Sequence, residues 1–200
     1  MGASYNSTGH ELRLPNIASS DGACVVDAEG TPYLDLTAGV WCISVGHRNQ
    51  RVTEAIRSQL EVLIHAGFSY SHPIVEEAAQ AVLSICDMED GGLVFLDSGS
   101  EAIDFARQAT RKITGRPLTL TFHDAYLGSL SSAIDRSANW ITVNWQECLS
   151  CPGGRRDVDC DHIDDIPEDV SEFVFEPGSS AGQVRFAPAP FVRRVVDRVR

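Results

Sequence analysis

Apolar residues recur at helical spacing in several stretches of the chain, and each stretch predicts an amphipathic helix. The predicted helices cover residues 52–63, 75–86, 102–113 and 191–199. Pro73 is suited to begin the second of them, and Gly115 followed by Pro117 is a stop signal for the third. The last one reaches Arg200 without a cap or a glycine stop, so we expect the chain to end inside a helix.

Shorter apolar or alternating runs predict β-strands. The predicted strands cover residues 24–26, 33–36, 92–96, 118–122, 140–145 and 173–175. The first two flank Asp27-Ala28-Glu29-Gly30, whose residue types favour a hairpin turn. Residues 1–20 are polar and without a clear period, so an arm over a neighbour and simple disorder both fit them. The pattern therefore places a hairpin before the first helix and the other strands after the second helix.

The turn Ser98-Gly99-Ser100 lies between predicted strand 92–96 and the helix that follows it. Backbone N–H groups in the first turn of a helix have no helical partner, and the helix dipole favours negative charge there. Glycine lets the backbone approach closely and the serines add hydroxyl donors, so the turn suits a phosphate group. A capped helix with Ser100 as its N-cap and nothing bound explains the same residues equally well. The residues alone leave both interpretations open.

Ser-Gly-Ser-Glu-Ala at 98–102, the Ala-Arg helix after it and Thr-Gly-Arg at 114–116 resemble the class III aminotransferases. These are fold-type I enzymes that use pyridoxal phosphate (PLP). The resemblance spans nearly all of residues 22–200, and only about the first half of such an enzyme. It implies an incomplete α/β fold with helices on both faces of a mostly parallel sheet, plus part of the small domain. Residues 1–70 would form the N-terminal arm, small-domain hairpin and linking helix, and residues 71–200 the first part of the large PLP-binding domain.

The resemblance also implies a set of cofactor-binding residues. These are Ser98, Gly99, Ser100, Tyr126 and Glu176. The serines and the glycine would hold the phosphate, the ring of Tyr126 would lie against the PLP ring, and Glu176 would orient partners near the hydroxyl side of that ring. Leu127 departs from the histidine that usually follows the aromatic residue, which leaves stacking itself unaffected. A glutamate that caps a loop is the alternative for Glu176.

Two aromatic residues are implied on the substrate side. The run Ala-Gly-x-Trp-Cys-x-x-x-Gly-His at 38–47 resembles the branch of the family that uses ω-amino acids or amines with pyruvate, and places Trp41 at the substrate pocket. Phe68 would reach across a homodimer into the partner's site. The alternatives are a buried core position for Trp41 and interdomain packing for Phe68. His47 is expected to be a turn or helix-entry residue rather than a catalytic one.

Lys112 is the only lysine in the chain. A PLP enzyme needs a lysine to hold the cofactor's aldehyde and to move the substrate's proton. Lys112 lies about three turns along the helix that follows the phosphate turn, roughly 15 Å from that turn. We therefore expect the catalytic lysine to lie outside these residues, and the chain alone to be truncated and inactive.

Cys148, Cys151, Cys160 and His162 form a group that could suggest zinc. The spacing between Cys151 and Cys160 fits no standard zinc template, and several class III sequences carry a Cys-x-x-Cys-Pro loop at this place. We therefore predict no metal at this group. Without a secretory signal, the cysteines of a chain this size are expected to be reduced.

The net charge of the 200-residue chain is -12 and its pI is near 4.8, which argues against a nucleic-acid or anionic-membrane surface. No apolar run approaches membrane-spanning length, and the polar start is not a signal peptide. These features predict a cytoplasmic protein, and the resemblance implies that its partners are small molecules and a second copy of itself.

The resemblance implies that the complete protein is a PLP-dependent aminotransferase. It would move an amino group from an amine or ω-amino acid to a keto acid such as pyruvate. Aminomutases, racemases and decarboxylases of the same fold share this half closely and remain open. A non-catalytic binding or dimerisation fragment is the other alternative, because no lysine stands in the expected place. The sequence does not determine the amino donor.

Overall fold

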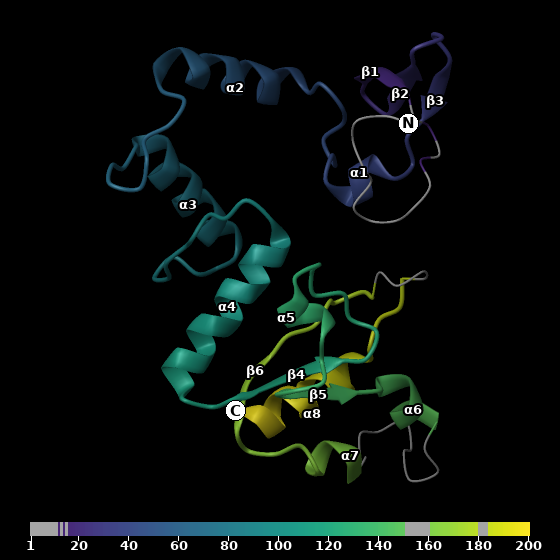
Figure 1. The fold of residues 1–200 in the computed structure, drawn as a ribbon, viewed down its shortest axis with the longest axis vertical. Helices are drawn as coiled ribbons and strands as arrows, with labels where there is room; N and C mark the ends of the chain where they lie inside the picture. Colours follow the sequence, from purple (N-terminus) through teal and green to yellow (C-terminus); the bar gives the residue numbers. More distant parts are fainter. Residues whose placement is uncertain (1–11, 13, 15, 151–160, 180–183) are drawn as a thin grey trace. The chain divides into compact units, whose positions relative to one another are not determined.

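The computed structural model describes residues 12, 14, 16–150, 161–179 and 184–200. The chain forms two compact units, Met1–Cys86 and Asp87–Arg200. The first contains a small antiparallel sheet and helices, and the second contains a parallel sheet flanked by helices (Figure 1). A functional domain boundary after residue 70 stays a prediction.

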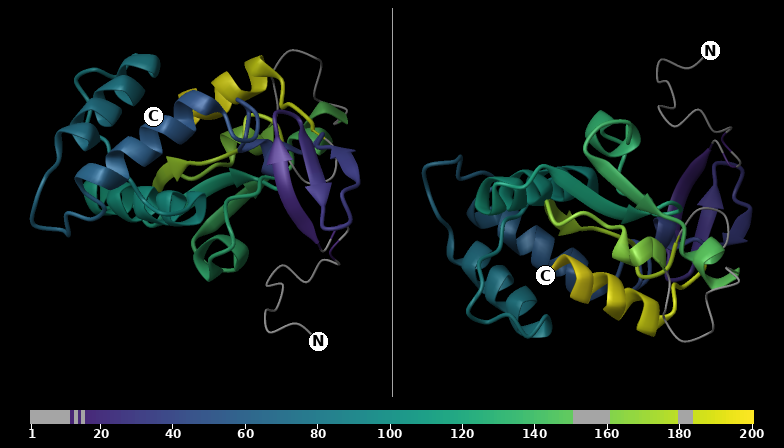
Figure 2. Two further views of the ribbon diagram at one scale, coloured as in Figure 1. Left: turned by 90° about the horizontal axis from the view of Figure 1, so that it is seen from above. Right: turned by 90° about the horizontal axis from the view of Figure 1, so that it is seen from below.

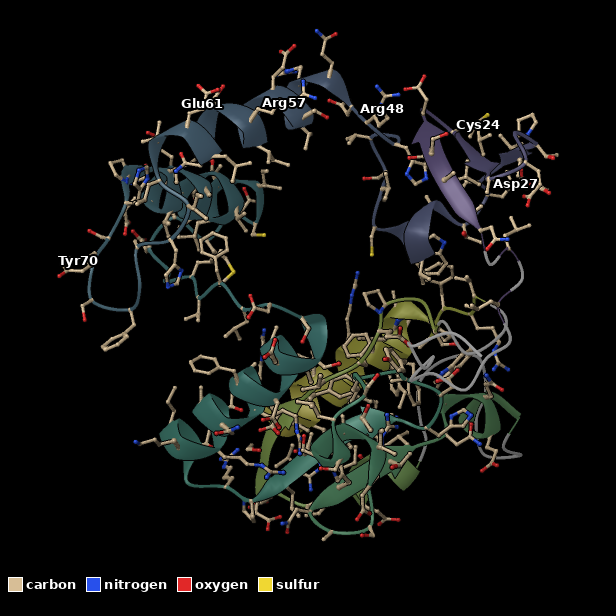
Figure 3. The ribbon with its side chains drawn as sticks, turned by 45° about the horizontal axis from the view of Figure 1, so that its top comes forward. Cys24, Asp27, Arg48, Arg57, Glu61 and Tyr70 are labelled. Atoms are coloured by element: carbon tan, nitrogen blue, oxygen red, sulfur yellow. The ribbon has the colours of Figure 1, made fainter. Side chains whose placement is uncertain are left out.

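The first unit begins with a three-stranded antiparallel sheet in the order β1-β2-β3. Its strands are β1 Ile17–Asp21, β2 Cys24–Asp27 and β3 Pro32–Leu34. Asp27 fixes the turn after β2, because its carboxylate accepts the Thr31 N–H at 2.7 Å and the Tyr33 hydroxyl at 2.9 Å. Cys24 and Asp27 are labelled on this hairpin in Figure 3. The predicted hairpin is confirmed, whereas β1 does not follow from the sequence pattern because its residues lack apolar alternation.

Helices make up the rest of the first unit. They are α1 Ala38–Trp41, α2 Gln50–Val62 and α3 Pro73–Ile85. The Asn49 side chain accepts the Val52 N–H at the start of α2, and the His72 ring accepts the Ile74 N–H at the start of α3. Arg57 and Glu61 are labelled on the same side of α2 in Figure 3. Both predicted helices, including the start at Pro73, are confirmed.

His47 joins the entry of α2 to the hairpin. Its backbone exchanges two hydrogen bonds with Gly22, at 2.8 and 3.0 Å, and its ring Nε2 lies 2.8 Å from Asp35 Oδ2. Both side chains of this pair are mostly buried. These contacts give His47 a structural role at the helix entry, as the sequence predicts.

The Asp35–His47 contact predicts an acid-sensitive contribution to stability. The hydrogen bond from His47, and after it the one from Thr37, lowers the pKa of Asp35 from 3.8 to about 2. Because the folded-state pKa lies below the ordinary value, this contribution is complete above pH 3.8 and is lost as the pH falls through about 2. We expect Asp35→Asn to flatten the dependence of the thermal unfolding midpoint on pH in this range. Exposed Asp21→Asn is the control, and equal pH slopes for Asp35→Asn and the wild type would contradict the prediction.

The second unit is built on a three-stranded parallel sheet in the order β5-β4-β6. Its elements are α4 Gly99–Thr114, β4 Leu118–Phe122, α5 Ser131–Ile134, β5 Trp140–Val143, α6 Trp145–Ser150, α7 Asp161–Asp164, β6 Val170–Phe173 and α8 Ala189–Val199. Helices α4 and α5 lie on one side of the sheet, and α7 and α8 lie on the other (Figure 2). The predicted α/β fold with helices on both faces of a parallel sheet is confirmed.

The two faces of this sheet have different chemistry. Leu120 and Phe122 of β4 are fully or almost fully buried in an apolar cluster that includes residues of α8. The Phe122 ring centroid lies 5.1 Å from that of Phe173 and 6.1 Å from that of Phe191. Thr119, which alternates with Leu120 along β4, is buried on the other face against Arg107 of α4. One face is therefore an apolar core and the other is polar.

Some predicted strands differ from the observed ones. Residues 92–96 form no strand, because their backbone pairs with no strand in the described part of the chain, and Val94, Phe95 and Leu96 are exposed. The strand predicted at 173–175 begins earlier, because β6 covers Val170–Phe173. Ser171 and Glu172 interrupt the apolar pattern there, so the pattern did not indicate this start. The ladder still runs into the predicted range, since the Val174 N–H donates to the Leu120 carbonyl at 2.9 Å.

Candidate cofactor site

Ser98 caps helix α4. Its backbone is extended, its Oγ accepts the Glu101 N–H at 3.2 Å, and its hydroxyl donates to the Glu101 carboxylate at 2.8 Å. The bond from the Glu101 N–H to Ser98 Oγ is that of a serine N-cap, while the Glu101 carboxylate accepts the Ser98 hydroxyl rather than the Ser98 backbone N–H. The interpretation that Ser100 caps the helix is therefore wrong, and the hydroxyl of Ser98 is already occupied. At the other end, Gly115 in the left-handed conformation ends α4, as predicted.

The first turn of α4 presents unused donors to solvent. Within the described part of the chain, the backbone N–H groups of Gly99 and Ser100 reach no acceptor. Ser98 and Gly99 are exposed, and a Cβ added at Gly99 would meet nothing within 4 Å. Open N–H groups at the positive end of a 16-residue helix dipole fit a phosphate group.

The loop after β4 closes on this turn. The Ser129 N–H donates to Ser100 Oγ at 2.9 Å, so that Ser100 still has its own hydroxyl hydrogen to donate. Gly128 lies against Ser100, since a Cβ at position 128 would come within 2.7 Å of Ser100 Oγ. Residues 29 positions apart in the sequence are thereby brought into direct contact.

Tyr126 and Glu176 are brought together at the same edge of the sheet. The Tyr126 N–H donates to Glu176 Oε2 at 2.8 Å, and the Tyr126 hydroxyl lies 2.7 Å from Ser129 Oγ. Tyr126 follows β4 and Glu176 follows β6, so both lie beyond the carboxyl ends of parallel strands, where open α/β sheets bind ligands. Tyr126 is 57% exposed, which leaves its ring accessible for stacking.

Leu127 has a different environment from its neighbour. It is 3% exposed and belongs to the apolar core. Leu127, which stands where the resemblance implies a histidine, is therefore a buried apolar residue. It offers no polar group to a ligand.

Two residues that the sequence patterns did not single out, Asp124 and Arg136, hold the Tyr126 loop. Asp124 has a side chain only 5% exposed, and it accepts hydrogen bonds from the Trp145 indole at 3.2 Å and the Gln146 amide at 3.4 Å. Arg136 donates to the Ala125 carbonyl at 2.5 Å. Neither Asp124 nor Arg136 belongs to a motif, so an aspartate two residues after a predicted strand was the only signal.

Helix α4 is fixed to the sheet by a buried charge cluster. Arg107 is 4% exposed, and its Nε lies 3.7 Å from the Glu172 carboxylate of β6. Thr119 of β4 donates to the same carboxylate at 2.5 Å, and Arg111 lies 3.9 Å from it. The Arg107 guanidinium also lies 4.1 Å from the centre of the Trp140 ring. This cluster sets where the open turn at 98–100 lies relative to the ends of the strands.

The substrate-side candidates lie in the first unit. Trp41 is 62% exposed, so it is not a core residue of this unit. It ends a left-handed turn in which Ala38, Val40 and Trp41 have φ of 47°, 59° and 66°. Phe68 is fully exposed on the loop between α2 and α3, where Tyr70 points away from both helices (Figure 3).

The remaining candidates are placed as follows. Lys112 is exposed on α4, in agreement with the predicted surface position. Cys151 and Cys160 lie outside the described residues, as do the side chains of Cys148 and His162, so the prediction of no zinc remains a prediction.

Comparison with known proteins identifies the family. The model of the class-III aminotransferases matches residues 5–152. The chain belongs to the class-III aminotransferases. It is 33% identical over 131 residues to the [LysW]-aminoadipate semialdehyde/glutamate semialdehyde transaminase of Sulfurisphaera tokodaii, covering 66% of this chain and 32% of that protein. It is 29% identical over 193 residues to the acetylornithine aminotransferase of Methanopyrus kandleri, covering 92% of this chain and 48% of that one.

Solved aminotransferase structures have the same fold. An S-selective transaminase from Arthrobacter sp. superposes with a TM-score of 0.80 at 20% identity, over 99% of this chain and 50% of that one. A Bacillus anthracis aminotransferase superposes with a TM-score of 0.83 at 23% identity, over 97% of this chain and 50% of that one. The chain thus spans half or less of the length of these proteins. Among its described helices, none has the length and apolar character needed to cross a membrane.

Proposed function

We propose that these residues form the phosphate-binding turn and the ring-stacking loop of a PLP-dependent transaminase. The complete protein would move an amino group from an amine or ω-amino acid to a keto acid such as pyruvate. Membership of the class-III family supports the reaction class. The observation that carries the proposal is the pair of open N–H groups at Gly99 and Ser100, next to the exposed ring of Tyr126.

Each residue of the site has a role that follows from its contacts. The N–H groups of Gly99 and Ser100 and the Ser100 hydroxyl would donate to phosphate oxygens, while Ser98 borders the site and holds the helix start. Tyr126 would cover one face of the cofactor ring, with its backbone held by Glu176. PLP, when bound, supplies an aldehyde and an electron-withdrawing ring.

The amine that holds the cofactor's aldehyde is not assigned to Lys112. Its side chain is exposed on α4, about three turns beyond the open donors. We propose that this lysine lies outside the present residues, which matches a chain that spans about half the length of its solved relatives.

The substrate side is proposed to come from two exposed aromatic residues. Trp41 would shape the substrate pocket, and Phe68 would enter the site of a second, identical subunit. Full exposure leaves the Phe68 ring available for a contact with another chain. The proposal therefore includes a homodimer, and a cytoplasmic location as predicted from the sequence.

An amino-transfer assay tests the proposed function. The purified complete protein is incubated with PLP, a panel of donors and either pyruvate or 2-oxoglutarate, and formation of alanine or glutamate is measured. The panel contains amines and ω-amino acids, and it adds N-acetylornithine because several relatives are named for it. Isomerised or decarboxylated product without an acceptor would point to an aminomutase, racemase or decarboxylase. A protein that retains no PLP would overturn the proposal.

Gly99→Val tests the phosphate turn by itself. A Cβ at position 99 points into open space, so we expect the free energy of unfolding to change by no more than about 0.5 kcal/mol. The same side chain would occupy the space in front of the open N–H groups, and we expect phosphate affinity to fall at least about tenfold. Calorimetric titration with pyridoxine 5′-phosphate and urea unfolding measure the two effects.

Gly92→Val is the matched control for Gly99→Val. Position 92 is also exposed, has ordinary φ and leaves a Cβ in open space, but it lies outside the turn. We expect it to change neither quantity. Unchanged ligand binding in Gly99→Val would show that the turn does not hold the phosphate.

A further inference from the structure

Ser129 makes two hydrogen bonds to different parts of the candidate site. Its backbone N–H donates to Ser100 Oγ at 2.9 Å, and its side-chain Oγ lies 2.7 Å from the Tyr126 hydroxyl. Ser100 belongs to the turn that opens α4, and Tyr126 carries the exposed ring. A single residue thus joins the two parts of the site that would hold the two ends of one ligand.

The backbone bond determines how Ser100 can act. A serine hydroxyl has one hydrogen and two lone pairs. One lone pair of the Ser100 hydroxyl accepts the Ser129 N–H, so the hydroxyl hydrogen remains available for another acceptor. Among the described residues, no acceptor receives this hydrogen, which leaves it for a ligand. Gly128 makes this contact possible, because any Cβ there would overlap Ser100.

The side-chain bond restricts the ring of Tyr126. An exposed tyrosine side chain can exchange between its staggered χ1 rotamers, and a hydrogen bond to its hydroxyl favours the rotamer that places the ring where that bond forms. The Tyr126 backbone is already bound to Glu176, and the Ser129 hydroxyl holds the far end of the same residue. Fixing a ring before a ligand arrives lowers the entropy cost of binding.

We propose that Ser129 is a positioning residue, which sets the stacking ring of Tyr126 in register with the phosphate donors of Ser100. This inference rests on the proposed function, and it goes further by assigning separate tasks to two parts of one residue. The side chain of Ser129 acts on the ring end of a phosphorylated aromatic ligand. The backbone N–H of Ser129 acts on the phosphate end.

Ser129→Ala separates the two tasks, because it removes the hydroxyl and keeps the backbone N–H. The probes are pyridoxine 5′-phosphate, which has a ring and a phosphate but no aldehyde, and inorganic phosphate. We expect Ser129→Ala to lower the affinity for pyridoxine 5′-phosphate about three- to tenfold, the effect of one lost hydrogen bond, with no change for inorganic phosphate. Ser129→Thr keeps a hydroxyl and should restore the affinity. Ser131→Ala, another exposed serine near the loop, is the matched control.

Tyr126→Phe is the second variant, and it carries the test if Ser129→Ala does not fold. It removes the same hydrogen bond from the other side and should give a similar selective loss. The double variant should then lose no more than either single one, because only one bond is broken.

The possible outcomes separate this inference from the proposed function. A selective loss for pyridoxine 5′-phosphate supports the positioning role. Equal losses for both probes would mean that Ser129 only maintains the fold, and no loss for either would mean that it positions nothing. A wild-type protein that binds neither probe would overturn the proposed function, and this inference with it.

Discussion

Replacing Glu172 by leucine should destabilise the second unit by about 3–5 kcal/mol, the usual cost of removing one partner of a buried ion pair. Glu172 has a side chain only 8% exposed, and it is the carboxylate that faces Arg107 and Arg111 across the polar face of the sheet. Without it, Arg107 would remain buried beside Arg111, with Asp104 as the weaker opposite charge that still acts on it. Burial lowers the pKa of Arg107, and the nearby positive charge of Arg111 lowers it further. The negative charge of Glu172 raises this pKa, so Glu172 stabilises the charged form of Arg107.

Neutral partners of Glu172 would lose hydrogen bonds at the same time. Thr119 and Thr110 both donate to its carboxylate, at 2.5 and 2.8 Å, and Arg111 donates to Thr119 at 2.9 Å. Leucine has no acceptor, so the buried hydroxyl of Thr119 would lose its strongest contact. The effect should therefore exceed that of an exposed glutamate by a wide margin.

Urea unfolding followed by tryptophan fluorescence measures the effect, since Trp140 stacks on Arg107 within the cluster. Glu168→Leu is the matched control, because Glu168 is exposed in the same unit and should change stability by no more than about 0.5 kcal/mol. Adding Arg107→Met to Glu172→Leu should recover part of the loss, because it replaces the buried charge that has lost its Glu172 partner with an apolar side chain. Similar unfolding midpoints for Glu172→Leu and Glu168→Leu would show that the cluster does not stabilise the fold.

This cluster also shows why part of the fold could not be predicted. The helix at 99–114 and the strand at 118–122 follow from local patterns, including the glycine that ends the helix. Glu172 breaks the apolar pattern of β6, and its burial is possible only because arginines from another element lie opposite. A local pattern contains no information on such a partner, so the strand was predicted three residues too late.

The residues of the candidate site could be predicted from the sequence, whereas the contacts between them could not. Ser98, Gly99, Ser100, Tyr126 and Glu176 were selected by motif, and in the structure they gather at one edge of the sheet. The contacts that join them could not be predicted, because they connect residues 29 and 50 positions apart. The sequence also could not decide which serine caps α4, since either one has the right chemistry. Their roles toward a cofactor stay predictions.

Gly128→Ala should destabilise the second unit by about 2–4 kcal/mol and disturb the phosphate turn, because it combines backbone strain with overlap. The φ of Gly128 is +109°, a value that residues with a Cβ rarely adopt. The added Cβ would also lie 2.7 Å from Ser100 Oγ and 2.9 Å from Ser100 Cα. Relief requires the loop to move away from α4, which breaks the Ser129–Ser100 hydrogen bond.

Gly115→Ala separates the two causes. Gly115 also has positive φ, at +68°, but a Cβ there would meet nothing within 4 Å, so this variant experiences strain without overlap. We expect it to lose about 1 kcal/mol and to keep its affinity for inorganic phosphate. Gly128→Ala should lose more stability in urea unfolding and should also bind inorganic phosphate more weakly, because the Ser100 hydroxyl is displaced. If the two variants are equally stable and bind phosphate equally well, the close packing of Gly128 on Ser100 neither limits the loop nor shapes the site.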